Sequence, residues 1–97
     1  MSRPAAQKAL AATERALSAI GEELARHAAG QGSVSSTGQL TQIRGQLTRI
    51  ADQLSSPELP PKAQRVRGVG RVIADSWPYD SPLGAAILEA EQLYLKA

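Results

Sequence analysis

One apolar stripe in residues 39–54 constrains the fold of this chain more than any other feature. Its members recur every three or four residues: Leu40, Ile43, Leu47, Ile50 and Leu54. That spacing places all of them on one side of an α-helix, while the positions between them are mainly polar. A helix cannot bury such a stripe alone, so other helical segments of the chain must pack on it.

The remaining apolar positions also follow helical spacing. The pattern predicts further helices, which gives a set at about residues 5–29, 38–55, 61–76 and 82–96 of a 97-residue chain. This length suits one helical domain spanning residues 1–97, and the chain shows little of the alternation that is typical of strands. We therefore expect an all-α fold, a compact antiparallel four-helix bundle with an aliphatic core.

Two of the predicted helices carry stripes of their own. In the first helix the stripe is made of Leu10, Leu17, Ile20 and Leu24, on an alanine-rich background with high helix propensity. In the last helix, Leu88 and Leu95 fall outside the main stripe. Either the buried arc of that helix is wide, or an apolar edge remains exposed for a partner or a second copy of the chain.

Caps and glycines indicate how these helices end and meet. Gly30 is placed to end the first helix, and Ser35, Ser36 or Thr37 can cap the second. Ser81 can cap the last helix, with Pro82 at its first position. Glycines inside helices lower their stability, so we interpret Gly45, Gly68 and Gly70 as points where another helix approaches closely.

Residues that could support catalysis or bind a metal are scarce. The chain has no cysteine and a single histidine, His27, which excludes thiolate metal sites and disulfides and leaves little for zinc. We interpret His27 as a helix-end residue that forms an ordinary surface pair with Glu23, four residues earlier. We expect no enzymatic activity, no cofactor and no metal, and therefore a binding protein.

Charge is spread unevenly along the chain, whose net charge is +2. The charged residues within 62–71 are all basic, whereas those within 75–91 are all acidic. Such segments either pair internally or present two faces to a partner. The chain has no apolar run of the roughly 18 residues that a membrane span requires, and its N-terminal segment lacks a signal-peptide core. We expect a cytoplasmic protein without membrane contact.

The segment WPYDSPLG, residues 77–84, contains two of the three aromatic side chains. Trp77 either closes the end of the bundle or anchors a partner, since Trp and Tyr dominate binding hot spots. A protein-binding function predicts a contact set in and around this segment: Asp75, Trp77, Tyr79, Asp80 and Glu89.

Several segments resemble a family of small all-helical bacterial immunity proteins. The likeness rests on ERAL at 14–17, QLTQIRGQL at 39–47, the Arg–Gly pattern around Arg65 and Gly68, and DSPLGAAILEAEQLY at 80–94. Members of this family neutralise NAD(P)-degrading glycohydrolase toxins that type VI secretion delivers in interbacterial competition. The resemblance implies a protein that covers the active site of a cognate toxin domain and excludes its substrate.

The resemblance does not identify specific inhibitory residues in this chain, and it leaves the toxin unidentified. Many toxin inhibitors are acidic, whereas this chain is mildly basic overall. Only the acidic stretch at residues 75–91 would suit a basic active-site cleft.

Two other functions compete with this hypothesis. A nucleic-acid-binding or regulatory protein would use a basic set against phosphates: Arg44, Arg49, Lys62, Arg65, Arg67 and Arg71. The sequence disfavours this function, because these residues lack an obvious recognition helix or interleaved aromatics. A homo-oligomerisation module, such as a homodimer, would instead pair the first two helices between chains.

Overall fold

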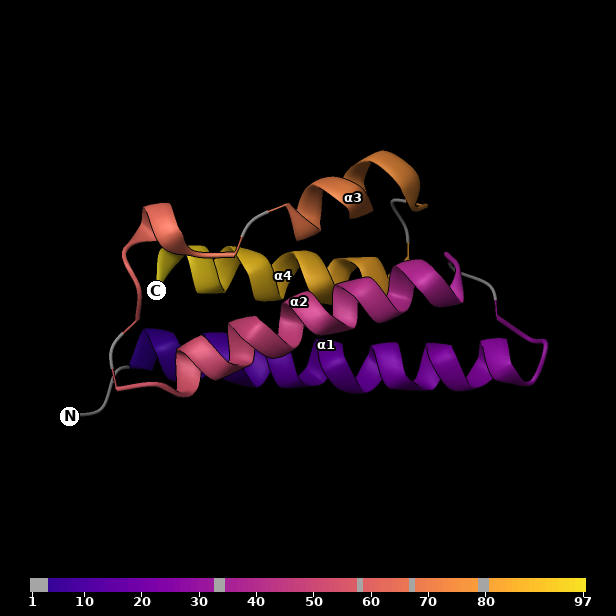
Figure 1. Ribbon diagram of the computed structural model, residues 1–97, viewed down its shortest axis with the longest axis horizontal. Coiled ribbons are helices and arrows are strands. Elements are labelled where there is room, and N and C mark those ends of the chain that lie inside the picture. Colours follow the sequence, from indigo (N-terminus) through magenta and orange to yellow (C-terminus); the bar gives the residue numbers. More distant parts are fainter. Residues whose placement is uncertain (1–3, 33–34, 58, 67, 79–80) are drawn as a thin grey trace.

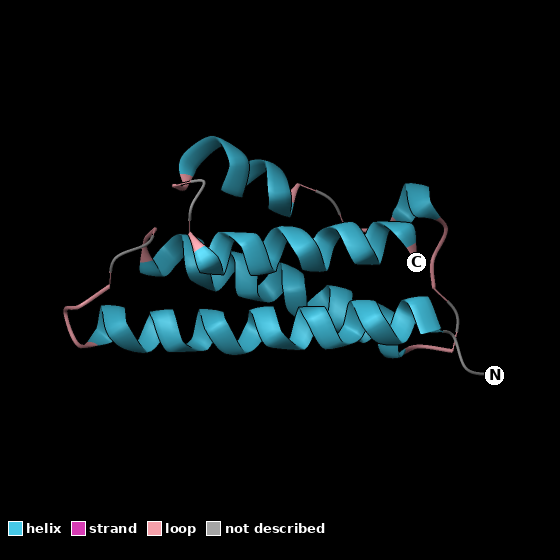
Figure 2. Cartoon of the chain, turned by 180° about the vertical axis from the view of Figure 1, so that it is seen from behind, coloured by secondary structure: helices cyan, strands magenta, loops and turns pink. Residues whose placement is uncertain are grey.

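A computed structural model describes residues 4–32, 35–57, 59–66, 68–78 and 81–97. Within these residues it contains α1 (Pro4–Ala28), α2 (Thr37–Ser55), the short 3-10 helix η1 (Lys62–Gln64), α3 (Val69–Ser76) and α4 (Pro82–Lys96), and no strand. The helices pack compactly (Figure 2), which confirms the expected all-α four-helix bundle. In the described part of the chain, no helix combines the length and apolar character needed to cross a bilayer.

The apolar stripe of α2 is buried as its spacing predicts. Each of its five side chains is at most 5% exposed. Ser36 caps the helix, because its hydroxyl accepts a hydrogen bond from the Gln39 N–H at 3.2 Å. The expected helix contact at Gly45 is wrong, since a Cβ placed there would meet nothing within 4 Å.

α1 packs through small residues rather than through its predicted leucine stripe. Its buried hydrophobic side chains are Ala6, Ala9, Ala12, Ala16 and Ile20. Leu10, Leu17 and Leu24 are only partly buried. α1 contacts two helices, α2 and α4, and a face of alanines allows both backbones to come near. The larger side chains then lie at the margins of these contacts.

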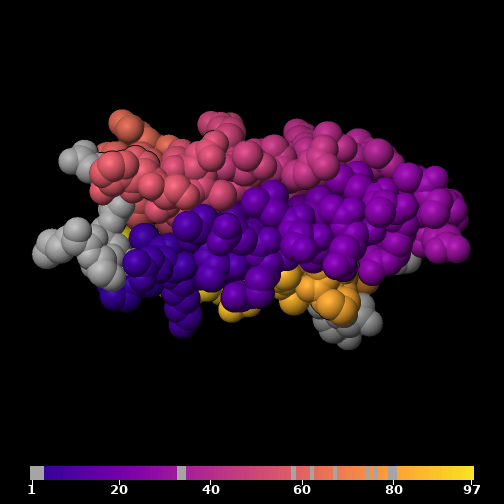
Figure 3. Space-filling view, turned by 90° about the horizontal axis from the view of Figure 1, so that it is seen from below, coloured from indigo at the N-terminus to yellow at the C-terminus, as the bar shows by residue number. Residues whose placement is uncertain are grey.

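The three longer helices run along the length of the molecule, which measures 45 × 23 × 20 Å. α1 is antiparallel to both α2 and α4 (Figure 1). Seen from below, α1 and α2 lie side by side over most of this length (Figure 3). α3 packs on α4, on the side away from α1 (Figures 1 and 2).

The third predicted helix, residues 61–76, is broken in the structure. A 3-10 turn covers only Lys62–Gln64, and α3 starts directly after Gly68. Gly68 has a φ of +95°, a left-handed conformation that a continuous α-helix cannot contain. The Val66 N–H donates to the Tyr94 hydroxyl at 2.8 Å instead of to a helical carbonyl. Contacts with α4 therefore override the helical pattern of this segment.

α3 lies close to α4 at Gly70. Its N–H donates to Glu91 Oε2 at 3.1 Å. A Cβ at this position would lie 2.5 Å from Glu91 Oε1 and 3.0 Å from Leu88 Cδ2. The predicted close contact is thus confirmed at Gly70 but not at Gly68, where a Cβ would meet nothing within 4 Å. Leu88 lies beside α3, and both Leu88 and Leu95 are partly buried.

Candidate protein-binding site

The candidate site lies where the C-terminal half of α1 meets the start of α4. Ser81 caps α4 as predicted, since its hydroxyl accepts a hydrogen bond from the Gly84 N–H at 3.2 Å. Pro82 follows at the first turn. A Cβ at Gly84 would lie 3.1 Å from Ile73 Cγ2, so this turn is also held closely against α3. The cap and this contact fix the backbone at the centre of the site.

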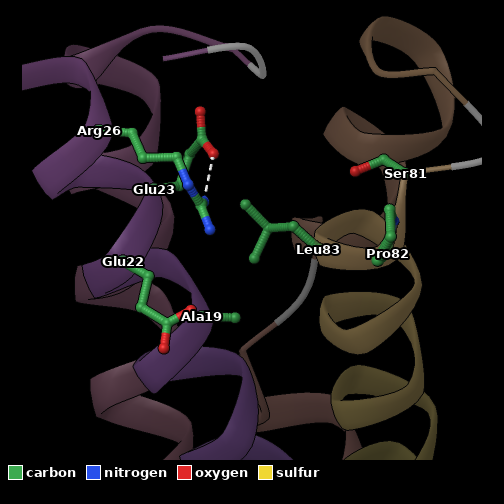
Figure 4. A pocket seen from close by; sticks show the side chains of 7 residues that line it. All are labelled: Ala19, Glu22, Glu23, Arg26, Ser81, Pro82 and Leu83. Carbon is green, nitrogen blue, oxygen red and sulfur yellow. Dashed lines mark hydrogen bonds and ion pairs between the residues drawn. The ribbon is translucent and has the colours of Figure 1, made fainter. Parts of the chain in front are cut away.

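A cleft of about 310 Å³ opens between α1 and this first turn of α4 (Figure 4). Its lining combines charged, hydroxyl and apolar side chains: Ala19, Glu22, Glu23, Arg26, Ser81, Pro82 and Leu83. The charged residues all come from α1. Figure 4 shows the Arg26 side chain extending from α1 toward α4, while the Glu22 carboxylate lies further down α1.

Glu23 is a buried carboxylate in the wall of this cleft, with an exposed fraction of only 3%. Its Oε1 accepts a hydrogen bond from Arg26 Nη1 at 2.9 Å, and its Oε2 lies 3.4 Å from His27 Nε2. Burial of a carboxylate is costly unless it is paired, and these contacts offset that cost. The predicted pair between Glu23 and His27 is present, but Glu23 is buried, so the expectation of an ordinary surface pair is wrong.

A second recess of about 200 Å³ lies between α3 and α4. Its lining is mainly apolar: Ile73, Trp77, Pro78, Ser81, Gly84, Ala85 and Leu88. Ser81 lines both recesses, so they adjoin. Trp77 forms part of the wall, but its ring is only 7% exposed, and its Nε1 donates to Gln39 Oε1 at 2.7 Å. The indole thus ties the end of α3 to the start of α2.

The structure places the predicted contact residues in different environments. Asp75 on α3 and Glu89 on α4 are exposed. Trp77 is largely buried, so its main visible role is to close the end of the bundle. Tyr79 and Asp80 lie outside the described residues. That any of these residues contacts a partner remains a prediction.

The structure removes Arg65 from the basic set of the competing nucleic-acid hypothesis. Arg65 is partly buried and donates to the backbone carbonyls of Pro60 and Tyr94 at 3.0 and 2.9 Å. Arg44 and Arg49 are exposed on α2, and Arg71 is exposed on α3. Arg67 and the side chain of Lys62 lie outside the described part of the structure.

Sequence reasoning missed the cleft and its charged wall. Glu23 continues the buried positions Ala16 and Ile20 at intervals of four and three residues. Glu23 was not among the predicted stripe positions, and its spacing of three residues from Ile20 was the available signal, because buried positions are rarely charged without a specific partner. Arg26, three residues later, could then have been inferred as that partner.

Among the described residues, no group of three His, Cys, Asp or Glu side chains is placed to hold a metal ion. No protein-family model matches this chain, and no curated protein matches it either. A functional assignment therefore depends on the geometry of the site and on the resemblance seen in the sequence.

Proposed function

We propose that this chain is an immunity protein that binds a cognate secreted antibacterial toxin domain and blocks its active site. The observation that carries the proposal is the pair of adjoining recesses at Ser81. One contains an arginine and the other is walled in part by a tryptophan, and these are the residue types that supply most hot spots in protein interfaces. A surface with two recesses can receive two side chains of a folded partner.

Exposed acidic residues on α3 and α4 support the proposal that the protein blocks an active site. Asp75 and Glu89 are exposed on α3 and α4. A toxin that binds a phosphate-containing substrate needs a positively charged cleft, and carboxylates of an inhibitor complement such a cleft. The further step to an NAD(P)-consuming toxin rests only on the sequence resemblance.

Two observations weigh against the competing functions. Arg65 is a poor candidate for binding phosphates, because its guanidinium donates hydrogen bonds to backbone carbonyls inside the fold. The homo-oligomer hypothesis requires the stripe of α2 to pair between chains, but α1 and α2 already pack together within one chain. All five residues of that stripe are buried there.

A co-expression rescue tests the proposal. The proposal implies a toxin gene beside the gene of this chain; that toxin domain is induced in a sensitive host, with and without the protein, and viability and NAD levels are followed. We expect rescue of both, and a stable complex on size-exclusion chromatography. Rescue without any NAD loss in the toxin-only culture would retain the immunity role and assign a different toxin chemistry. The absence of both rescue and a complex would refute the immunity function.

Charge reversals locate the contact surface in the same assay. Asp75→Lys and Glu89→Lys change exposed helical residues, so the fold should tolerate them. The matched controls are Asp52→Lys on α2 and Glu14→Lys on α1, which are equally exposed. We expect the first pair to weaken rescue and the controls to retain it. Equal effects of both pairs would exclude α3 and α4 as the acidic contact surface.

A further inference from the structure

The buried Glu23 carboxylate orders a guanidinium at the edge of the cleft. The Glu23 side chain is 4% exposed, whereas the Arg26 side chain is 51% exposed. A surface arginine normally samples many rotamers, and ordering it costs side-chain entropy. The 2.9 Å hydrogen bond to a buried carboxylate orders the Arg26 side chain when the protein folds, so this entropy is not lost again when a partner binds. Arg26 is therefore preorganised for binding.

Among the described residues, the cleft retains hydrogen-bond donors that have no partner within the fold. The bond to Glu23 comes from one nitrogen of the Arg26 guanidinium, which carries five N–H donors in all. On the opposite side, the Ser81 oxygen accepts from the Gly84 N–H, which leaves the hydroxyl proton able to donate. Ala19 and Leu83 add apolar lining that suits a methylene chain.

We propose that this cleft receives an aspartate or glutamate side chain of the partner protein, held by Arg26 and the Ser81 hydroxyl. The inference rests on the proposed function, and it identifies the chemistry of one contact within it. A guanidinium pairs with a carboxylate through parallel N–H···O bonds, which gives both strength and direction. Among the described lining residues Arg26 is the one base, beside the carboxylates of Glu22 and Glu23, and it would supply a contact of opposite sign to the exposed acids Asp75 and Glu89.

Glu22 provides a way to test the charge of the partner side chain that occupies the cleft. Its exposed carboxylate also lines the cleft, one helical turn before Arg26. A partner carboxylate would be repelled by Glu22 and attracted by Arg26, whereas a partner lysine or arginine would reverse both effects. Removal of each charge in turn therefore reports the charge of the occupant.

The test measures the dissociation constant of the complex with the adjacent toxin domain by calorimetry at low ionic strength. We expect Arg26→Ala to weaken binding about tenfold or more, as removal of an interface arginine commonly does. Arg26→Lys should recover only part of this loss, because lysine lacks the fork geometry. Glu22→Gln should tighten binding roughly two- to threefold.

Matched variants on the same helix control for charge and helix propensity. Arg15→Ala and Glu14→Gln change exposed residues of α1 outside the cleft lining, and both should leave the dissociation constant unchanged. Circular dichroism and urea unfolding establish that each variant is folded. Weaker binding by Glu22→Gln together with tighter binding by Arg26→Ala would identify a cationic occupant and overturn the inference.

A toxin that binds with the same affinity to wild type and Arg26→Ala would overturn this inference while the immunity function stands. A titration with millimolar glutarate, a small dicarboxylate, tests the cleft without the toxin. We expect a saturable shift of the Arg26 Nε–H resonance in an ¹⁵N spectrum and none at Arg15. Identical, non-saturating shifts at both arginines would show that the cleft has no preference for carboxylates, whether or not the toxin binds.

Discussion

The guanidinium of Arg65 lies over the ring of Tyr94, with its central carbon 5.7 Å from the ring centroid. The same guanidinium donates to the backbone carbonyls of Tyr94 and Leu95 at 2.9 and 3.3 Å. These carbonyls belong to the last turn of α4, where positive charge is favourable, and the Tyr94 carbonyl also accepts from the Ala97 N–H at 3.2 Å. Arg65 therefore caps α4 from a segment 29 residues earlier in the chain.

Replacement of Arg65 by lysine should destabilise the fold by about 1–2 kcal/mol, because a single ammonium cannot serve these carbonyls and that of Pro60 together. Urea unfolding measures the loss. Arg49→Lys, at an exposed position of α2, is the control and should change stability by less than about 0.5 kcal/mol. Equal effects at the two positions would mean that the Arg65 contacts contribute little to stability.

The hydroxyl of Tyr94 links three segments of the chain. It accepts from the Val66 N–H at 2.8 Å and donates to the Gln53 side-chain carbonyl on α2. Tyr94→Phe preserves the buried ring but leaves the Val66 N–H without this acceptor. We expect a loss of about 1–3 kcal/mol in urea unfolding and faster hydrogen exchange at the Val66 amide. Unchanged exchange at that amide would argue against this account.

The fold was predictable wherever one local pattern determines the structure. The stripe of α2 contains large aliphatic residues, so its buried side is the same whichever helices cover it. The caps at Ser36 and Ser81 depend on bonds that span three residues, and Gly30 after α1 has a φ of +76°. Local chemistry was sufficient at each of these positions.

The features that escaped prediction depend on distant segments. Hydrophobicity ranks Leu10 above Ala9, but the contacts of α1 with two helices place the alanine inside. The break between η1 and α3 requires Tyr94 and Arg65 to compete with helical bonding. The buried Glu23 belongs to a cleft that exists only once α1 and α4 are side by side. One sequence contains no direct record of such tertiary contacts.

Replacement of Gly45 or Gly70 by alanine should change the stability of the fold in opposite directions. Gly45→Ala adds a methyl group where nothing lies within 4 Å and should stabilise α2 by about 0.5–1 kcal/mol. Gly70→Ala places a Cβ 2.5 Å from Glu91 Oε1, so the carboxylate must move and give up its hydrogen bond from the Gly70 N–H, which should destabilise the fold by about 1 kcal/mol. Thermal and urea unfolding of both variants measure the difference. Stabilisation by Gly70→Ala would mean that α3 and α4 are further apart than described.

The bond between Trp77 Nε1 and Gln39 Oε1 joins the end of α3 to the first turn of α2. Trp77→Phe and Gln39→Ala each remove it, so their effects on stability should not add. A double-mutant cycle should give a coupling of about 1 kcal/mol, the usual value of a partly buried hydrogen bond. Gln42→Ala, at an exposed position of the same helix, replaces Gln39→Ala in the control cycle and should show no coupling. Strict additivity in the first cycle would mean that the indole is held only by its apolar contacts.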